Sequence, residues 1–359
     1  MKRINLFLVI VMLASILAAC GSPAEPAADD GAAAPDTAEE AAAEESSDGA
    51  MAVEGEPYVD HLFATVADYE AATGNTLEFS ESPMMTAMVD SGDLPAVADR
   101  LPAEPGVVRP RDAIGQFGGQ VRVIGFYEGA GAFSGLTEGM QQGFFMLDPN
   151  YAAYHANIAK GWELSEDGMS LTIHLREGMK WSDGDDFTTE DIRFWHEEIV
   201  QNAEIMPNIS DSLMPGGELM GLNVIDDYSF EFTFSIPYYR AVEVFAGGEY
   251  YAASHALQQY MPTYNEDAEA LAEEQGYESW QQAFQFHAGT SDDYYDRDTT
   301  MPTLNPWIIS EIGADSVLWT RNPYYWRVDI AGNQLPYMDE VLVIMTENVN
   351  ATAPVKSLA

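Results

Sequence analysis

The most informative part of the sequence runs from Gly168 to Ile199 and reads GMSLTIHLREGMKWSDGDDFTTEDIRFWHEEI. Its first part alternates apolar Leu171, Ile173 and Leu175 with polar residues, which is the period-2 pattern of a strand with one buried face. The segment 182–186, Ser-Asp-Gly-Asp-Asp, has turn chemistry, because Asp and Ser side chains bond nearby backbone groups and Gly tolerates positive φ. We therefore predict a strand over 170–176 followed by a tight acidic turn.

A helix is predicted after this turn, over 188–201. Thr188 stands at the N-cap position and Asp191 follows three residues later, a variant of the capping box. Apolar residues recur at helical spacing and form one face, namely Ile192, Trp195, Ile199 and Val200. The stretch thus predicts a strand–turn–helix unit.

The run LREGMKWSDGDDFTTEDIRFWHEEI resembles a signature region of the oligopeptide/dipeptide/nickel-binding family of ABC-transporter solute-binding proteins. A second run, RNPYYWRVDIAGNQLPYMDEVLVIM over 321–345, resembles another segment of that family, a turn-rich link into a strand. The resemblance implies a mixed α/β fold of the periplasmic-binding-protein type, with two lobes. It covers about 115–359 and matches the N-terminal half of a full-length member, so we expect a fragment that holds an incomplete N-terminal lobe.

Further elements are expected along this region. A strand opens the body after Gly118-Gly119, and its loose alternation suggests that both of its faces are covered. A hairpin over 222–234 places Phe230, Phe232 and Phe234 on one face. The resemblance implies an inserted hairpin subdomain over about 150–245. The remaining expectations are helices over 253–260, 266–276 and 279–286, strands over 308–310 and 316–319, and the start of a helix over 350–359.

The N-terminus has the features of a secretory signal. Lys2 and Arg3 precede an apolar run over 4–17, which is shorter than the roughly 20 residues of a membrane-spanning helix. The boundary Leu-Ala-Ala-Cys20 is similar to the lipobox of a bacterial lipoprotein, which implies cleavage before Cys20 and a diacylglycerol anchor on its thiol. A plain signal peptide with an incidental cysteine is the alternative. Residues 1–20 are therefore interpreted as a lipoprotein signal peptide and the location as extracytoplasmic, anchored to the membrane by lipid.

The segments between the signal and the body differ in composition. Residues 21–56 consist almost entirely of Ala, Glu, Asp, Pro, Gly and Ser, which favours a disordered tether; an acidic binding tail is the alternative. Residues 57–114 form a lead-in with helices predicted over 60–72 and 82–90 and an extended, Pro-rich end. The solute-binding domain is expected to occupy 115–359.

The charge balance is strongly acidic, with 59 Asp and Glu against 15 Lys and Arg in 359 residues, a formal net charge of −44. A field of this sign repels nucleic acid and anionic lipid headgroups, so neither is expected to bind the folded body. The charge could enrich cationic solutes near the surface, or it could reflect a salty habitat in which surface carboxylates are screened.

The chemistry of enzymes and metal centres is not evident in the sequence. Cys20 is the single cysteine, and the sequence His196-Glu197-Glu198 lacks the second His of a zinc-protease motif because position 200 is Val. The turn at 183–186 lacks the ligand spacing of a calcium loop. We therefore expect no catalytic residues, no metal and no cofactor.

The binding residues are sought in the glycine-rich segment 126–145, which the resemblance places near the mouth of the solute cleft. Tyr127, Glu128 and Phe133 are the candidates: Glu128 could meet a cation and the two aromatic rings could stack on a solute, while a purely structural role is the alternative. The resemblance implies a protein that closes over a peptide or a related small solute and delivers it to the permease subunits of an ABC importer. A solute-binding sensor lipoprotein and a secreted hydrolase are the other functions considered.

Overall fold

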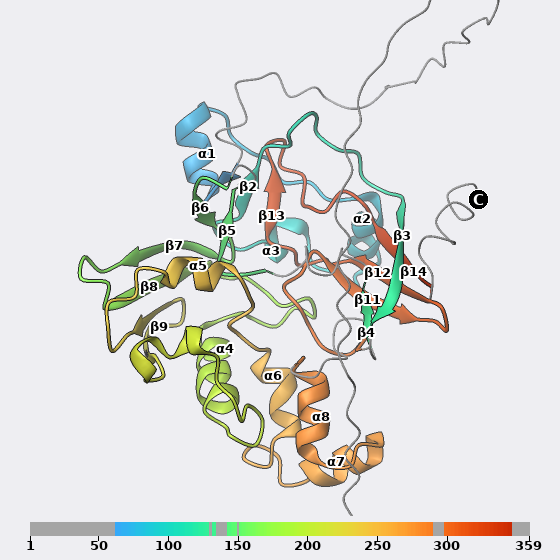
Figure 1. The fold of residues 1–359 in the computed structure, drawn as a ribbon. Helices are drawn as coiled ribbons and strands as arrows, with labels where there is room; N and C mark the ends of the chain where they lie inside the picture. Colours follow the sequence, from blue (N-terminus) through green and yellow to red (C-terminus); the bar gives the residue numbers. More distant parts are fainter. Residues whose placement is uncertain (1–61, 129–130, 134–141, 149–150, 290–297, 347–359) are drawn as a thin grey trace, which may run out of the picture. The chain divides into compact units, whose positions relative to one another are not determined.

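The computed structural model describes residues 62–128, 131–133, 142–148, 151–289 and 298–346. All of them belong to one compact unit, Ser47–Ala359. The predictions for the signal peptide at 1–20, the tether at 21–56 and the helix from 350 lie outside the described residues. The architecture is mixed α/β, as expected, with strands in four separate sheets and helices between them (Figure 1). None of the helices in the described ranges has the length and apolar character needed to cross a membrane.

The four-stranded sheet contains the predicted strand and hairpin. Its order is β7-β8-β10-β9, antiparallel throughout, with β7 at Ala159–Leu164, β8 at Ser170–Leu175, β9 at Gly221–Asp226 and β10 at Ser229–Thr233. Leu171, Ile173 and Leu175 are fully buried, as are Phe230 and Phe232 on the neighbouring strand. The alternation predicted for both segments is confirmed, because these five side chains pack into the main hydrophobic core.

The helix after the acidic turn begins as predicted and changes character halfway. Thr188 and Asp191 form a complete capping box at the start of α4 (Thr189–Phe194). The continuation, η1 (Trp195–Val200), has the wider π-helical winding, which the sequence did not predict. The predicted apolar face, with Ile192 and Trp195 among its members, is nevertheless buried in the main core.

The five-stranded sheet has the order β11-β12-β14-β3-β4. Its strands are β3 (Gln120–Glu128), β4 (Gly131–Phe133), β11 (Trp307–Ile312), β12 (Ser316–Arg321) and β14 (Glu340–Thr346). β3 and β14 run parallel, with Val121 opposite Val341, and the other pairs are antiparallel. The predicted strands at 308–310 and 316–319 are confirmed and extend further.

The expectation that both faces of the opening strand are covered is wrong in this structure. Gln120 and Arg122 are exposed, while Val121 is half-buried. A polar row occupies the open face: Gln120 donates to Glu340 at 2.9 Å and accepts from Arg122 at 3.1 Å. These polar side chains can remain hydrated, so that face of the strand needs no cover.

The lead-in contributes to a three-stranded sheet of order β1-β2-β13, made of β1 (Leu62–Phe63), β2 (Gly106–Val108) and β13 (Arg327–Asp329). The helix predicted from residue 60 starts only at Val66, because residues 62–63 pair with β2 and Thr65 caps α1 (Val66–Thr73). The second helix, α2 (Pro83–Ser91), has Ser82 as N-cap and Pro83 at its first position, as predicted.

The remaining elements follow the predicted order. The helical segments are α3 (Val97–Arg100), η2 (Asp211–Leu213), η3 (Pro215–Gly217), α5 (Ala241–Ala246), α6 (Ser254–Leu257), η4 (Gln258–Tyr260), α7 (Ala268–Gln275) and α8 (Trp280–His287). A two-stranded sheet pairs β5 (Phe145–Leu147) with β6 (Tyr154–Ala156). In Figure 1 the helices α4, α6, α7 and α8 lie together below the sheets, and the helices predicted over 253–260, 266–276 and 279–286 are confirmed.

Candidate functional site

The three candidate residues of the glycine-rich segment lie on a hairpin at the end of the five-stranded sheet. Tyr127 and Glu128 end β3, with Tyr127 opposite Ala132 of β4, and Phe133 ends β4. The pairing of β3 with β4 satisfies the backbone groups of these residues. Their side chains, and residues 129–130 and 134–141, lie outside what the structure describes, so their roles stay predictions.

A pocket of about 340 Å³ opens between the acidic turn after β8 and the helices that follow β10. Its walls come from segments far apart in the sequence: Trp181 just before the acidic turn, η1, the link between α5 and α6, the end of α8 and residues 301–303. The residues that line it are Trp181, Trp195, Ile199, Met206, Gly247, Gly248, Glu249, Tyr251, Ala252, Ala253, Leu257, His287, Ala288, Gly289, Met301, Pro302 and Thr303. This size suits a small solute or one end of a longer one.

Three aromatic side chains in the lining are held firmly by other rings. Trp181 and Tyr251 lie 5.8 Å apart between ring centres, and Phe187 packs edge-on against both of them at 5.5 and 5.4 Å. Trp195 packs edge-on against Tyr250 at 5.5 Å. Because these rings are locked by their neighbours, the pocket presents preformed aromatic surfaces that need no ordering when a solute enters.

The acidic group of the pocket is Glu249. Its Oε1 accepts from the backbone N–H of Gln142 at 3.4 Å. Burial raises the pKa of Glu249 to about 7, although its hydrogen bonds by themselves would lower this pKa. The neutral form of this carboxyl is therefore favoured over a wider pH range than in an exposed glutamate.

The imidazole that lines the pocket belongs to His287, and it is paired with a carboxylate. His287 Nδ1 lies 2.6 Å from Asp298 Oδ2 in a buried pair, and its ring stacks on Tyr260 with the centres 4.2 Å apart. Hydrogen bonds from His287 and Thr300 lower the pKa of Asp298, although burial alone would raise it. Among the described residues that line the pocket, none is Lys or Arg.

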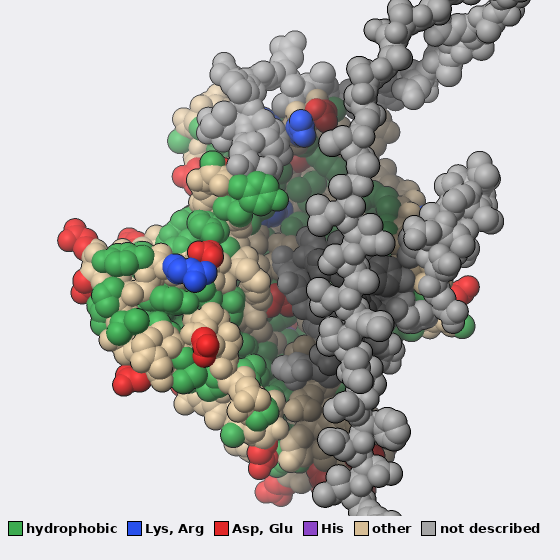
Figure 2. Space-filling model, in the orientation of Figure 1, with side chains coloured by type: hydrophobic (Ala, Val, Ile, Leu, Met, Phe, Trp, Pro, Cys, Tyr) green, Lys and Arg blue, Asp and Glu red, His purple; other side chains and the backbone are tan. Residues whose placement is uncertain are grey.

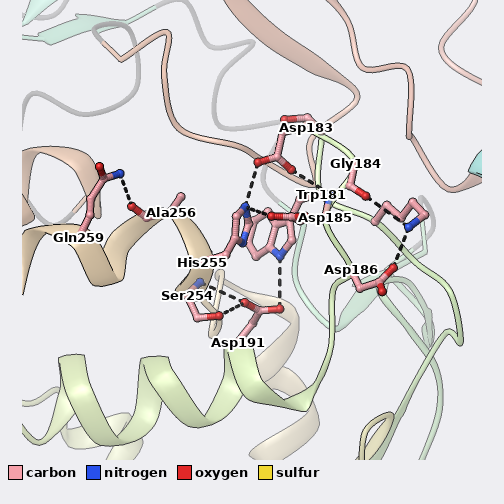
Figure 3. A network of polar contacts seen from close by, with 12 residues as sticks. Trp181, Asp183, Gly184, Asp185, Asp186, Asp191, Ser254, His255, Ala256 and Gln259 are labelled. Carbon is pink, nitrogen blue, oxygen red and sulfur yellow. Dashed lines mark hydrogen bonds and ion pairs between the residues drawn. The ribbon is translucent and has the colours of Figure 1, made fainter. Parts of the chain in front are cut away.

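Behind the pocket, Asp191 joins three elements (Figure 3). Its Oδ2 accepts from Trp181 Nε1 at 3.2 Å and from the backbone of Thr188, while its Oδ1 accepts from the backbone and hydroxyl of Ser254 at 3.1 and 2.8 Å. Burial raises the pKa of Asp191, and this effect outweighs the hydrogen bonds, which by themselves would lower the pKa. The residue predicted as a helix cap therefore also fixes a pocket tryptophan and the start of α6.

The acidic turn meets His255 of α6 in the same view. His255 Nε2 lies 2.9 Å from Asp183 Oδ2 and 3.3 Å from Asp185 Oδ2. The bond to Asp183 raises the pKa of His255; burial alone would raise the pKa of Asp183, but its bond to His255 lowers it. Among the described residues, these three form the group whose possible ligand atoms all lie within 4.8 Å of one another. The contacts of His255 with the two carboxylates account for the arrangement, so we assign no metal to it.

Sequence reasoning missed most of this pocket. Trp181 and Trp195 were recognised as parts of the strand–turn–helix unit, but Glu249 and His287 stand in segments without a distinctive motif. The sequence signal that could have drawn attention to Glu249 is the run Gly-Gly-Glu-Tyr-Tyr over 247–251, in which an acid stands between two glycines and two tyrosines.

The comparisons with known proteins agree with this fold. The family described as bacterial extracellular solute-binding proteins, family 5 Middle, matches residues 153–357. The periplasmic alpha-galactoside-binding protein of Rhizobium meliloti (strain 1021) is 32% identical over 295 residues, which are 74% of this chain and 39% of the relative.

Two solved structures extend the comparison. An oligopeptide-binding protein OppA superimposes with a TM-score of 0.74 and 35% identity, covering 81% of this chain and 45% of its own. The periplasmic binding protein MelB of Agrobacterium fabrum C58, in complex with stachyose, superimposes with a TM-score of 0.62 and 29% identity, covering 77% of this chain and 43% of its own. The chain thus spans less than half the length of these relatives.

Proposed function

Since the chain belongs to the bacterial extracellular solute-binding proteins of family 5, we propose that it is the solute-binding component of an ABC importer. The observation that carries the proposal is the family match over 153–357, which contains the strand–turn–helix unit and all of the residues that line the pocket. In this role the protein captures a solute outside the cytoplasmic membrane and delivers it to permease subunits. It binds and releases the solute unchanged, so it is not an enzyme.

The ligand proposed first is a peptide, in keeping with the similarity to an oligopeptide-binding protein. An oligosaccharide is the second candidate, because relatives are named for binding alpha-galactosides or hold stachyose. The rings of Trp181, Trp195 and Tyr251 favour it, since the apolar faces of sugars pack well against aromatic rings. Both classes offer hydrogen-bond donors to Glu249.

The mechanism proposed is hinge closure between two lobes. In this proposal the described residues belong to one lobe, which also contains the pocket. Tyr127, Glu128 and Phe133, at the end of the five-stranded sheet, are proposed to line the cleft. Solute that bridges both lobes favours the closed form, which is the form that docks on the permease. We propose the segment around 150–245 as an inserted subdomain of the solute-binding domain at 115–359, with 57–114 as its lead-in.

The location proposed is extracytoplasmic, with a lipid anchor on Cys20 and residues 21–56 as the tether. Replacing Cys20→Ser should release the protein from the membrane fraction into the soluble fraction of the envelope. Ser22→Ala, two residues away, should leave it in the membrane fraction. Equal partitioning of the Cys20 variant and the unaltered protein would contradict the anchor.

The test of the function uses the protein expressed from its complete reading frame. Calorimetric titration with a mixture of tri- to pentapeptides, and separately with stachyose, should show saturable binding to one of the two classes. Deleting the gene should abolish uptake of that ligand by cells. Binding with unchanged uptake would instead support the sensor lipoprotein, and hydrolysis of the ligand would support the hydrolase.

A further inference from the structure

We propose that His196 is a positioning residue of the pocket, which holds the π-helical segment η1 in place and thereby fixes the ring of Trp195 in the pocket wall. The inference rests on the proposed function, because it takes this pocket as part of the solute site. His196 is not among the described residues that line the pocket, so it acts on a solute through its neighbour.

The segment that carries His196 has an uncommon winding. After α4 the chain continues from Trp195 to Val200 as a π-helix, in which N–H groups bond to carbonyls five residues back. Such turns are rare and occur frequently at functional sites. Two of the six residues, Trp195 and Ile199, line the pocket. Since a continuous α-helix is the common alternative, contacts made by the side chains of η1 must favour the π-helical form.

His196 makes hydrogen bonds through both of its ring nitrogens. The side chain is 4% exposed, and its Nε2 lies 2.8 Å from the carbonyl oxygen of Met220. A carbonyl can only accept, so Nε2 carries the hydrogen and donates it, and Nδ1 accepts from Gln201 Nε2 at 3.2 Å. Met220 is buried directly before β9, and Gln201 is the C-cap residue of η1. One imidazole therefore joins η1 to the four-stranded sheet and to its own C-terminal end.

The ring of His196 also belongs to a closed circuit of aromatic contacts around Trp195. Its centre lies 6.2 Å from that of Trp195 and 6.4 Å from that of Phe232. Phe232 stacks on Phe245 with the centres 4.6 Å apart. Tyr250 closes the circuit, because it lies edge-on to Phe245 at 4.9 Å and edge-on to Trp195 at 5.5 Å. Trp195 is therefore held by His196 and by Tyr250 while it lines the pocket.

A ring held in this way needs no ordering when a solute binds. Without the imidazole, the side chain of Trp195 gains freedom that the solute has to remove again, and immobilising a side chain costs affinity. We therefore expect the loss of His196 to weaken solute binding roughly two- to tenfold, although no contact with the solute is removed. Because the effect acts through Trp195, it should disappear when Trp195 is replaced.

The first measurement needs no solute. The protein is expressed from its complete reading frame with 5-fluorotryptophan, and fluorine NMR spectra are compared, with Trp195→Leu identifying the Trp195 signal. His196→Leu should shift or broaden this signal. His196→Gln keeps a donor near the position of Nε2, so it should show a smaller change, and it decides the question if His196→Leu does not fold. The control is Val328→Ala, a fully buried change in a separate hydrophobic cluster, which should leave the Trp195 signal unchanged.

The probes for the second measurement carry no basic side chains. The formal net charge is −44, and on the face seen in Figure 2 acidic side chains are scattered over the surface while basic ones appear at few places. A cationic peptide would be attracted to such a surface at many points. Stachyose and, separately, a mixture of tri- to pentapeptides without Lys or Arg are therefore used.

The second measurement is a double-mutant cycle on the affinity for these probes. Calorimetric titration compares the unaltered protein, His196→Leu, Trp195→Leu and the double variant, and circular dichroism checks that each is folded. His196→Leu alone should weaken binding roughly two- to tenfold. In the Trp195→Leu background the same change should have little further effect, because the two residues act as a unit. Val328→Ala should leave the affinity unchanged.

The outcomes separate the inference from the proposed function. If the Trp195 signal is the same in His196→Leu as in the unaltered protein, His196 does not position Trp195 and the inference is wrong. The inference is also wrong if His196→Leu leaves the affinity unchanged or weakens it equally in both backgrounds. If neither probe binds the unaltered protein, the proposed function is contradicted, while the fluorine spectra still decide whether His196 positions the ring.

Discussion

The guanidinium of Arg176 lies 4.7 Å from the centre of the Trp326 ring, and both side chains are almost completely buried. Arg176 comes from the first signature stretch of the sequence and Trp326 from the second. Arg176 also donates to the carbonyls of Ala64 at 2.6 Å, Glu104 at 2.7 Å and Asn157 at 2.9 Å. One arginine therefore holds the lead-in, the four-stranded sheet and the C-terminal signature together.

Arg176 should be among the residues most important for stability. Replacing Arg176→Met leaves several buried carbonyls without their donor, and we expect a loss of at least about 3 kcal/mol in the free energy of unfolding. Burial lowers the pKa of Arg176 to about 9, which reflects the cost of holding this charge inside. Denaturant titration measures the loss, and limited proteolysis should show earlier cleavage within 62–114.

The matched control is Arg193→Met. Arg193 pairs with Glu190 and Glu197 on the exposed side of α4, and such surface pairs contribute at most about 1 kcal/mol. Equal losses for the two variants would contradict the role assigned to Arg176.

Gly332 should tolerate no side chain. Its φ is +84°, and a Cβ atom there would overlap the carbonyl oxygen of Glu78. Gly332→Ala should therefore cost about 2–5 kcal/mol, from the left-handed backbone and the forced displacement together. Gly276→Ala is the control, since its φ is +91° but nothing lies within 4 Å of its Cβ position; there only the backbone cost of about 1–2 kcal/mol is expected. Thermal unfolding of both variants tests the difference, and similar losses would show that the contact with Glu78 adjusts freely.

The ion pair of His255 should make stability depend on pH. The bond to Asp183 raises the pKa of His255 in the folded state, so the folded protein holds this proton more tightly than the unfolded chain. The resulting stabilisation is complete below the unfolded pKa of about 6.5 and is lost as the pH rises through the folded pKa. Since the pair is partly exposed, the effect should stay below about 1 kcal/mol.

Unfolding measured from pH 5 to pH 9 tests this dependence. His255→Gln should show a smaller decline above pH 6.5 than the unaltered protein, whereas His174→Gln, a change on β8, should show the full decline. Parallel pH profiles for His255→Gln and the unaltered protein would refute the assignment.

Glu249 should reduce stability at high pH even in the absence of solute. Its folded pKa of about 7 lies above its usual value, so stability is complete at pH 4 and falls as the pH rises toward 7. Such a shift corresponds to at most about 3 kcal/mol, and partial exposure reduces the expected effect to about 1–2 kcal/mol. Glu249→Gln should thus be more stable than the unaltered protein at pH 8 and equal to it at pH 4.

The control for Glu249 is Glu243→Gln. The bond from Arg240 lowers the pKa of Glu243, so losing this carboxylate should not stabilise the protein at pH 8. Denaturant titrations of both variants at the two pH values compare them directly. A gain at pH 8 for Glu243→Gln, or none for Glu249→Gln, would contradict the buried-acid interpretation.

The elements that local sequence patterns predicted correctly are those whose causes lie within a few residues. Leu171, Ile173 and Leu175 predicted β8 by alternation, and Thr188 with Asp191 predicted the start of α4, because a strand face and a capping box are set within a few residues. The two signature runs indicated the family because each of them is a contiguous stretch of sequence that resembles a segment of that family. Where a distant partner intervened, the prediction was wrong: residues 62–63 pair with β2 rather than beginning a helix.

The pocket, in contrast, depends on how distant segments pack together. Trp181 and Glu249 are 68 positions apart in the sequence, and they meet because the acidic turn, η1 and the link between α5 and α6 pack around one core. The pKa of Glu249 likewise depends on burial that no local pattern encodes. Local sequence sets hydrogen bonds and side-chain alternation over a few residues, whereas the position and electrostatics of a binding site are set by which distant segments exclude water together.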